Sequence, residues 1–331
     1  MTSTTLLRRL ALACALTFTA ASHAADAAPS TRPLPADWYP ESIAVGPDGS
    51  FYVGSWRQGA VARIAPGSDQ PDVLVSPGSN GLSNGQGVLV DTRRGLLWVC
   101  SGTLGYTTVP TNPSALKSYD LATGAPRASY ELPDKGYCND LTQDDHGNLY
   151  ITDSLQPRIF RWRDGDSALE LWKQDASFNA GTEGFKLNGI AIDRNHIYVS
   201  TVTAAPYLLR IDMKPDGSAG GVTRIDMPRT LKNADAVRSA GHDRLVIFES
   251  NAFGHDGPYG GQITLATLSG NRAASLVTLV AGLNDPSSGV IANGRVYFIE
   301  SKYSLLFAHK DDDAAIPRHV PFDVQSVPLP Q

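Results

Sequence analysis

The stretch CNDLTQDDHGNLYITDS, Cys138–Ser154, has the pattern of a strand, a turn built from Asp, His and Gly, and a second strand. Apolar and β-branched segments separated by such turn residues are typical of a β-hairpin. The first strand nevertheless opens with Asn139 and Asp140, although Asn and Asp are among the poorest strand formers. Either a turn leads into this strand, or polar groups are needed at its start. Further copies of the pattern decide between these explanations.

The same pattern occurs five more times, in residues 41–55, 86–101, 187–201, 235–250 and 288–301. We call the residue that opens the inner strand of each copy its anchor. The six anchors are Glu41, Gln86, Asn139, Asn188, Asp235 and Ser288. Successive anchors are 45, 53, 49, 47 and 53 residues apart. Strand-and-turn units that repeat at roughly 40 to 50 residues are typical of β-propellers.

The sequence therefore predicts an all-β fold, a six-bladed β-propeller, that forms a single domain over residues 25–331. An open sandwich or two separate all-β domains would not account for so regular a repeat. Further strand-like segments lie between the copies and are the predicted third strands of the blades: Ala60–Ile64, Ala115–Tyr119, Arg158–Trp162, Leu208–Ile211 and Gln262–Leu268.

Each anchor is followed two positions later by an apolar residue. These residues are Ile43, Val88, Leu141, Ile190, Val237 and Val290. Because side chains two apart in a strand point to the same side, each anchor would end an otherwise apolar face. We predict that all six anchors surround one mouth of the central channel. The residue directly after the anchor is small in five copies, and Asp140 is the exception.

The anchors offer oxygen atoms and neither sulfur nor imidazole. Two are carboxylates, Glu41 and Asp235, and three are amides, Gln86, Asn139 and Asn188. Buried carboxylates that meet repel each other unless a cation neutralises them. Ligation by oxygen alone suits one divalent cation, with Ca²⁺ as first choice and Mg²⁺ or Mn²⁺ next. Zn²⁺ is a further alternative, and a metal-free channel filled by polar side chains and water is the competing explanation.

Four of these segments carry a resemblance to a known family. PESIAVGPDGSFYV, CNDLTQDDHGNLYITD, LNGIAID and NADAV resemble the SMP-30/gluconolactonase/LRE family of regucalcin-like lactonases, and more distantly diisopropylfluorophosphatase and the paraoxonases. The resemblance covers about residues 38 to 301. It implies one catalytic divalent ion held by Glu41, Asn188 and Asp235, with Asn139 completing or flanking the set.

The resemblance implies a metal-dependent hydrolase that opens a lactone or a related ester. The ion would polarise the carbonyl, and Asp235 would act as general base towards the attacking water, or as a nucleophile. Two positions depart from the pattern of the family. Tyr137 stands where regucalcin-like members often have a substrate-binding arginine, and Ala236 follows Asp235 where glycine is usual. A specificity for sugar lactones is therefore not implied.

Two other classes of function stay open at this point. A phosphotriesterase or a lyase could use the same metal site, and a non-catalytic propeller could bind a ligand or a protein partner. For the hydrolase, loops above the ring of anchors would contact a small-molecule lactone or ester, as would some of the anchors. The predicted substrate-binding residues are Arg57, Gln86, Tyr137, Asn139 and His255. The segments Gly102–Pro113 and Asn251–Gly261 and the residues Trp56, Lys302 and Tyr303 are further loop candidates.

The N-terminus has the pattern of a cleavable signal peptide over Met1–Ala24. Arg8 and Arg9 precede a short apolar run, and Ser22-His23-Ala24 provides a small-x-small cleavage site. We therefore expect a periplasmic or secreted protein, with no membrane anchor elsewhere in the chain. Removal of this segment would take the formal net charge from −5 to −7, which disfavours nucleic acid as a partner. The sequence gives no indication of the oligomeric state.

Two cysteines, Cys100 and Cys138, lie outside the predicted signal peptide. In a propeller the end of a second strand and the start of the next first strand lie on the same side of neighbouring blades. An exported protein permits a disulfide between these positions. Two buried free thiols are also compatible with the sequence.

Overall fold

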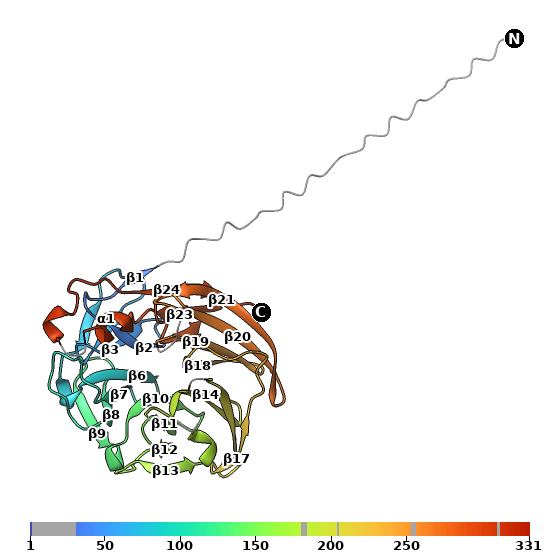
Figure 1. Cartoon of the computed structure of the whole chain (residues 1–331), viewed down its shortest axis with the longest axis horizontal. Coiled ribbons are helices and arrows are strands. Elements are labelled where there is room, and N and C mark those ends of the chain that lie inside the picture. The colour runs from blue at the N-terminus through green and yellow to red at the C-terminus, as the bar shows by residue number, and fades with distance from the viewer. Residues whose placement is uncertain (2–30, 180–183, 204, 253–255, 310–311) are drawn as a thin grey trace.

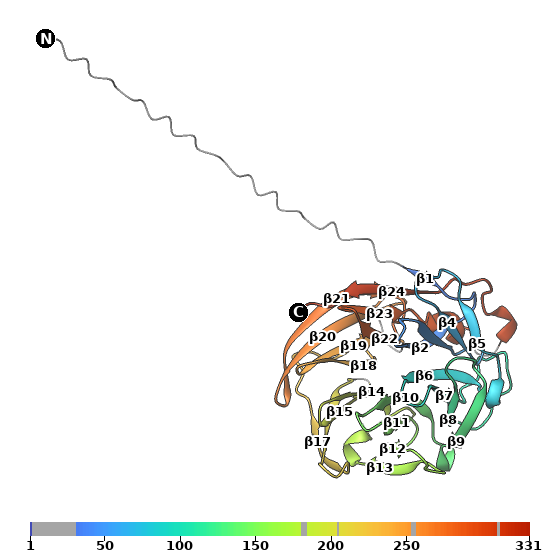
Figure 2. The same cartoon turned by 180° about the vertical axis from the view of Figure 1, so that it is seen from behind.

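Six four-stranded antiparallel sheets surround a central axis in the structure, a computed structural model (Figures 1 and 2). It describes Met1 and residues 31–179, 184–203, 205–252, 256–309 and 312–331. The fold is the predicted six-bladed β-propeller. The proposed signal peptide lies outside the described residues except for Met1. Among the residues described, no helix is long and apolar enough to cross a membrane.

Five blades take their four strands consecutively from the chain, from the inner strand to the outer one. Blades 1 and 2 consist of β2 (Pro40–Val45), β3 (Phe51–Ser55), β4 (Ala60–Ile64), β5 (Asp72–Val75), β6 (Asn84–Asp91), β7 (Leu96–Gly102), β8 (Ala115–Asp120) and β9 (Pro126–Glu131). Blades 3 and 4 consist of β10 (Cys138–Gln143), β11 (Leu149–Asp153), β12 (Arg158–Trp162), β13 (Glu170–Gln174), β14 (Leu187–Asp193), β15 (His196–Thr201), β16 (Leu208–Met213) and β17 (Ala219–Arg224). Blade 5 consists of β18 (Ala234–Gly241), β19 (Arg244–Glu249), β20 (Gly261–Ser269) and β21 (Arg272–Leu283).

All five predicted third strands are confirmed, as β4, β8, β12, β16 and β20. The inner strands of neighbouring blades contact one another around the ring, so they line its centre. In the described part of the chain, helical structure is limited to short connecting turns. These are α1 (Tyr303–Phe307) and the 3₁₀ turns η1 (Ser79–Gly81), η2 (Pro133–Lys135), η3 (Ala176–Phe178) and η4 (Asp313–Ala315).

Blade 6 joins the two ends of the described chain, which the sequence did not predict. Its strand order is β22 (Ser288–Ala292), β23 (Arg295–Ile299), β24 (Asp323–Pro328) and β1 (Arg32–Pro33). β1 pairs antiparallel with β24, with Arg32 opposite Val324. The backbone NH of Leu34 then donates to the carbonyl of Phe322 at 2.8 Å. The N-terminal segment thus closes the ring.

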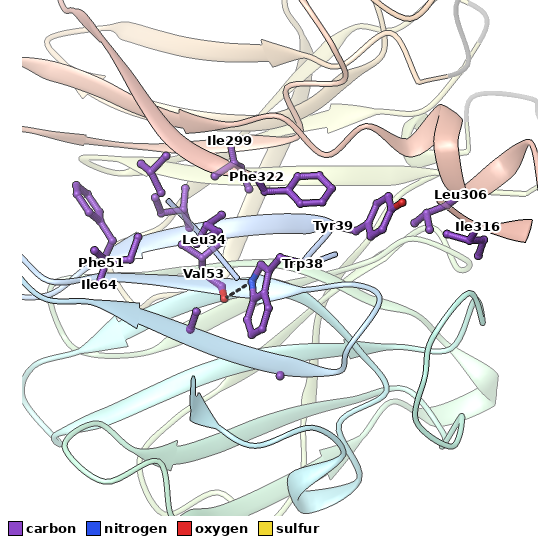
Figure 3. Packing of buried hydrophobic residues seen from close by; sticks show 14 residues of the cluster. Leu34, Trp38, Tyr39, Phe51, Val53, Ile64, Ile299, Leu306, Ile316 and Phe322 are labelled. Atoms are coloured by element: carbon purple, nitrogen blue, oxygen red, sulfur yellow. Dashed lines mark hydrogen bonds between the residues drawn. The ribbon is translucent and has the colours of Figure 1, made fainter. Parts of the chain in front are cut away.

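Apolar side chains pack between the blades, and the largest cluster joins blade 1 to blade 6 (Figure 3). It includes Trp38, Tyr39 and Phe51 from the N-terminal part and Ile299 and Phe322 from the C-terminal part. The indole NH of Trp38 donates to the carbonyl of Val53 at 3.2 Å, so the polar atom of this buried ring is satisfied. Burying one such side chain contributes about 1.5 to 3 kcal/mol, so this cluster stabilises the closed ring.

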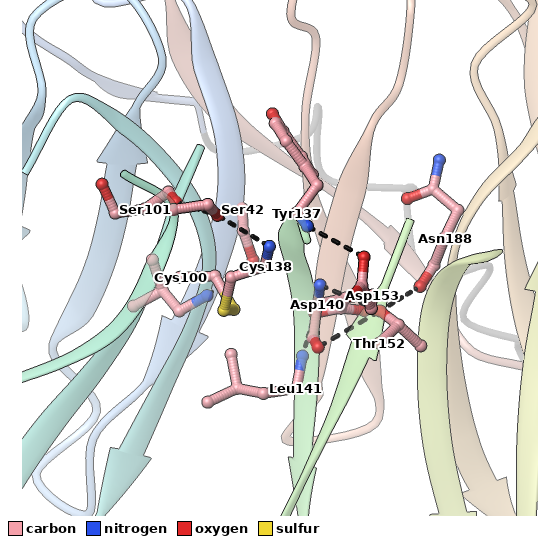
Figure 4. The surroundings of a disulfide bond; sticks show 12 residues. Ser42, Cys100, Ser101, Tyr137, Cys138, Asp140, Leu141, Thr152, Asp153 and Asn188 are labelled. Carbon is pink, nitrogen blue, oxygen red and sulfur yellow. Dashed lines mark hydrogen bonds between the residues drawn. A yellow bond between two sulfur atoms is a disulfide. The ribbon is translucent and has the colours of Figure 1, made fainter. Parts of the chain in front are cut away.

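Cys100 and Cys138 form a disulfide with a Cα–Cα distance of 5.1 Å (Figure 4). Cys100 lies on β7 of blade 2, and Cys138 is the first residue of β10 of blade 3. Of the two states that the sequence left open, the structure therefore has the bonded one. The backbone NH of Cys138 also donates to Ser114 Oγ at 2.8 Å, which fixes the strand directly before Asn139.

Candidate metal and substrate site

A cavity at the end of the channel where the inner strands begin collects five of the six anchors. Its carboxylate and amide side chains come from every blade except blade 6. These side chains are Glu41, Gln86, Asn139, Asn188, Asn233 and Asp235. Each is at most 8 % exposed. The structure thus brings together the four predicted metal ligands, although they lie up to 194 positions apart in the sequence.

Each of these five anchors lies in a β-bulge. In β10, Cys138 pairs with Asp153 and Leu141 with Ile151, so the inner strand carries one residue more than its partner. Corresponding bulges occur in β2, β6, β14 and β18. A bulge breaks the alternation of a strand and redirects a side chain. Each bulge includes the anchor itself, so the regular alternation assumed from the sequence is wrong at this point.

The two carboxylates of the cavity lack a direct cationic partner among the described residues. Burial raises the pKa of Glu41 well above its usual value, and the charges of Asp235 and Asp140 raise it further. Burial also raises the pKa of Asp235, to about 7, against hydrogen bonds from Ser250 and Asn188 that lower it. Both shifts express the cost of keeping negative charge in this cavity.

The donor set fits an oxygen-preferring divalent cation. Two carboxylates would be neutralised by such an ion, and the side chains of Asn139 and Asn188 could supply amide oxygens. Asn188 Nδ2 donates to Asp235 Oδ1 at 2.7 Å, so these two predicted ligands are already in contact. No group of three or more His, Cys, Asp or Glu side chains suited to a metal occurs in the described part of the chain. An ion in this cavity would therefore depend on the amides.

Gln86 and Tyr137 also lie where the sequence placed them, in the lining of this cavity. Both are 1 % exposed, and neither Gln86 Nε2 nor the Tyr137 hydroxyl has a hydrogen-bond partner. Burial raises the pKa of Tyr137, and the charges of Glu41 and Asp235 raise it further. The unpartnered Tyr137 hydroxyl therefore lies within the electrostatic field of the two carboxylates.

Arg57 lies outside the cavity, contrary to its predicted contact with substrate. Its guanidinium forms a salt bridge with Asp313 at 2.6 Å and donates to the carbonyl of Tyr106 at 3.0 Å. These partners hold the side chain over the neighbouring loop, while the adjacent Trp56 lines the cavity instead. His255, the other loop residue predicted to bind substrate, lies outside the described residues.

Ser288 also departs from the prediction that all six anchors surround the mouth. It is absent from the cavity lining, and its strand β22 pairs with β23 in unbroken register. Its hydroxyl instead accepts a hydrogen bond from Arg238 Nη2 at 3.0 Å. The ring of polar anchors is therefore open at blade 6.

A largely buried ion pair across the channel, with the Arg238 side chain 17 % exposed, was not predicted from the sequence. Arg238 Nη1 on β18 contacts Asp140 Oδ2 on β10 at 2.7 Å, and Arg238 Nε donates to the carbonyl of Gly289 on β22 at 3.1 Å. The pair thus links blades 3, 5 and 6. The sequence did contain a sign of this ion pair, because Asp140 is the one residue after an anchor that is not small.

Aromatic and aliphatic side chains complete the cavity. Tyr303 and Trp56 were among the loop candidates, whereas Phe185, Val202 and Phe307 were missed because their segments have no repeated pattern. Trp56 contacts Tyr303 and Phe307, with ring centroids 5.1 and 6.0 Å apart. The site therefore combines a polar floor with apolar walls.

Three solved structures illustrate what the chain is similar to. A gluconolactonase from Xanthomonas campestris has a TM-score of 0.57 at 13 % identity, covering 90 % of this chain and 87 % of that one. A luciferin-regenerating enzyme has a TM-score of 0.60 at 11 % identity, with 91 % and 95 % covered. A calcium-binding protein, regucalcin, from Agrobacterium tumefaciens has a TM-score of 0.56 at 13 % identity, with 88 % and 91 % covered.

The resemblance of the sequence motifs to the SMP-30/gluconolactonase/LRE family therefore extends to the fold. At these identities the similarity establishes the propeller and not its chemistry. Comparison of the sequence with protein-family models and with curated proteins gives no match.

Proposed function

We propose that the protein is an exported hydrolase that opens a lactone or a related ester with the aid of one divalent cation. The observation that carries this proposal is the convergence of Glu41, Asn139, Asn188 and Asp235 in one cavity. Four blades supply these side chains, and each lies in a bulge that interrupts the inner strand. Propeller structure alone requires neither the buried carboxylates nor the bulges.

The same four residues are the proposed ligands, and Ca²⁺ is the first choice because every donor is an oxygen. The calcium-binding description of the regucalcin with a similar fold supports this choice. When bound, the ion would act as a Lewis acid on the substrate carbonyl and stabilise the negative charge that develops there.

The protein's own residues would handle water and protons. Asp235, held by Asn188 Nδ2, is the proposed general base. It would take a proton from a water molecule whose oxygen forms a bond to the carbonyl carbon. The bond from that carbon to the ring oxygen then breaks, and the ring oxygen receives the proton. The products are a hydroxyl group and a carboxylic acid on one open chain.

Export is proposed from the signal pattern in Met1–Ala24 and is supported by the disulfide between Cys100 and Cys138. Disulfides persist in oxidising compartments and are rare in the cytosol. Fractionation of producing cells would test this part, and recovery of an uncleaved chain from the cytosol would contradict it.

Hydrolysis of a lactone panel by the purified exported protein tests the proposal. The protein is stripped of metal and assayed alone and with Ca²⁺, Mg²⁺, Mn²⁺ or Zn²⁺, beside Asp235→Ala. We expect activity that one ion restores and that the folded variant lacks. Ion binding measured by calorimetry without any ester or lactone hydrolysis would overturn the hydrolase and favour another reaction. Absence of ion binding would favour a propeller that only binds a partner.

A further inference from the structure

The walls of the cavity are apolar, whereas its polar groups are concentrated at the floor. Trp56, Leu104, Phe185, Val202 and Phe307 supply the walls together with Tyr303, whose hydroxyl is already hydrogen-bonded with Ser301 and Ser287. The floor amides are partly committed, because Asn188 donates to Asp235, and Asn233 Nδ2 donates to Ser250 Oγ at 2.7 Å. A substrate body that lies above the floor would therefore contact mainly carbon.

The aromatic rings are held in place before any ligand binds. Trp56 Nε1 donates to the carbonyl of Gly105 at 3.2 Å, so the one polar atom of this ring is already used. Tyr303 and Phe307 stack with centroids 5.6 Å apart, and on another part of the wall Tyr137 contacts Phe185 at 5.1 Å. Fixed rings bind an apolar ligand without paying for their own ordering.

No Lys, Arg or His occurs among the described residues that line the cavity. Basic side chains next in the sequence to lining residues contact other partners; Lys232 Nζ, for example, contacts Asp256 Oδ2 at 2.9 Å. Arg57 pairs with Asp313, and Lys302 Nζ donates to the carbonyl of Pro321 at 2.6 Å. Apart from the proposed cation, an anionic substrate would find no positive side chain among the described lining residues. Hydroxyl groups along the substrate body would lose water without gaining partners from the walls.

The Tyr137 hydroxyl is a polar group in this cavity that is left without a partner. It has no hydrogen bond, although the side chain is 1 % exposed. It lies over Gly102, where a Cβ atom would come within 2.4 Å of the hydroxyl oxygen, so glycine makes room for it. A buried hydroxyl without a partner destabilises a fold. A substrate oxygen would satisfy it.

We infer that the site takes an uncharged lactone with an apolar body, and that the Tyr137 hydroxyl donates a hydrogen bond to an oxygen of that substrate. This inference rests on the proposed hydrolase function and names its substrate class. Trp56, Phe185 and Phe307 would cover the apolar body. Tyr137 is then a residue that determines specificity, separate from the predicted metal ligands.

The test compares two lactones of equal ring size, δ-decalactone with its alkyl chain and the polyhydroxylated gluconolactone. We expect kcat/KM to be at least roughly 100-fold higher for δ-decalactone, since each buried methylene adds several-fold. Tyr137→Phe is expected to lower kcat/KM for δ-decalactone about 10-fold while its Tm stays equal or rises. A preference for gluconolactone, or an unchanged kcat/KM in Tyr137→Phe, would overturn the inference and leave the hydrolase standing.

Tyr119→Phe is the matched control. Tyr119 is equally buried, but its hydroxyl donates to the carbonyl of Ser79 at 2.9 Å, far from the cavity lining. This variant should lose stability and keep its kcat/KM, which is the opposite of the result expected for Tyr137→Phe. If both variants lost only stability, Tyr137 would have a structural role and the inference would be overturned.

Binding of the corresponding lactams separates this inference from the proposed function, because lactams resist hydrolysis. If the protein hydrolyses neither lactone, the proposed function has failed and calorimetry decides the inference. Tighter binding of the alkyl lactam, weakened about 10-fold by Tyr137→Phe, would support the apolar site. Tighter binding of the polyhydroxylated lactam, or no binding of either lactam, would overturn it.

Discussion

Five inner strands carry a bulge at the anchor, whereas β22 of blade 6 does not. In the bulged strands the anchor lines the cavity, and in β22 the register runs unbroken from Ser288 opposite Ile299 to Ala292 opposite Arg295. Ser288 instead contacts Arg238 away from the lining. The comparison indicates that the bulge, and not the position in the repeat alone, directs a side chain into the site.

Blade 6 also differs from the other blades in the contacts of the residue after the anchor. Ser42 Oγ accepts from the backbone NH of Val88 at 3.2 Å, and Asp140 Oδ2 accepts from that of Ile190 at 3.1 Å. At Gly189 a Cβ atom would lie 2.6 Å from the backbone of the next inner strand. At Gly289 it would meet the ring of Phe248 instead. Small residues after the anchors therefore reflect the close approach of neighbouring inner strands.

The largest difference between the two kinds of strand is expected when a charged anchor is removed from a bulged strand. We expect Asp235→Asn to lower kcat/KM about 10²- to 10⁴-fold, since it removes the proposed general base. Ser288→Ala, in the strand without a bulge, should stay close to the wild-type activity. Steady-state kinetics at saturating metal measures both. Equal losses in the two variants would show that the bulge has no bearing on function.

The link between bulged and unbulged strands is tested at Arg238. Arg238→Met leaves Asp140 buried without its counter-charge, so we expect the free energy of unfolding to fall by about 3 to 5 kcal/mol. Urea unfolding of the variant gives this value. Arg238→Met combined with Asp140→Asn should recover much of the loss because no unpaired charge remains. A double variant as unstable as Arg238→Met alone would contradict a coupled pair.

The disulfide between Cys100 and Cys138 links the bulged strand β10 to β7 of the neighbouring blade. Replacing Cys100 and Cys138 together by Ala should lower the free energy of unfolding by about 2 to 4 kcal/mol, because the unfolded chain loses a crosslink. The reductant dithiothreitol should destabilise the wild-type protein similarly and leave the double variant unchanged. A reductant effect on the double variant would assign the loss to something other than this disulfide.

The smallest expected effect concerns the contact between bulged strands in blades 1 and 2. Ser42→Ala removes the acceptor for the backbone NH of Val88, so we expect a loss of about 1 kcal/mol in unfolding free energy. Ser68→Ala, whose hydroxyl forms exposed hydrogen bonds with Gln70 two residues away, should change it by less than about 0.5 kcal/mol. Unfolding curves for both variants provide the test, and indistinguishable values would mean that the inter-blade bond adds no stability.

Features that recur in every blade could be predicted from the sequence, whereas features that occur in one place could not. Six anchors and five third strands follow from the period, because every blade must bury the same faces against its neighbours. The bulges could not be predicted, because most of them begin one residue into the strand, where too few residues precede them to show a break in the alternation. β1 is two residues long, too short to show any pattern.

The site was predictable as far as it depends on the repeat. The positions of Glu41, Asn188 and Asp235 follow from it, whereas the direction of Arg57 depends on Asp313, 256 positions away in the chain. The sequence left open whether the two cysteines form a disulfide or stay free thiols, and the structure shows the disulfide. The aromatic walls come from segments between the repeats, where each residue is determined by contacts distant in the sequence.

Ring closure by β1 has a consequence for the order of folding. Arg32 and Val324 must meet across 292 positions of the chain, and a loop of that length costs about 5 kcal/mol in entropy. Blades 1 to 5 consist of consecutive strands and can form from local contacts, whereas blade 6 must wait for the last strand. A chain that ends before β24 would expose the edge of β23, which is a template for aggregation. We therefore expect chains that lack β24 to aggregate more readily than the complete propeller.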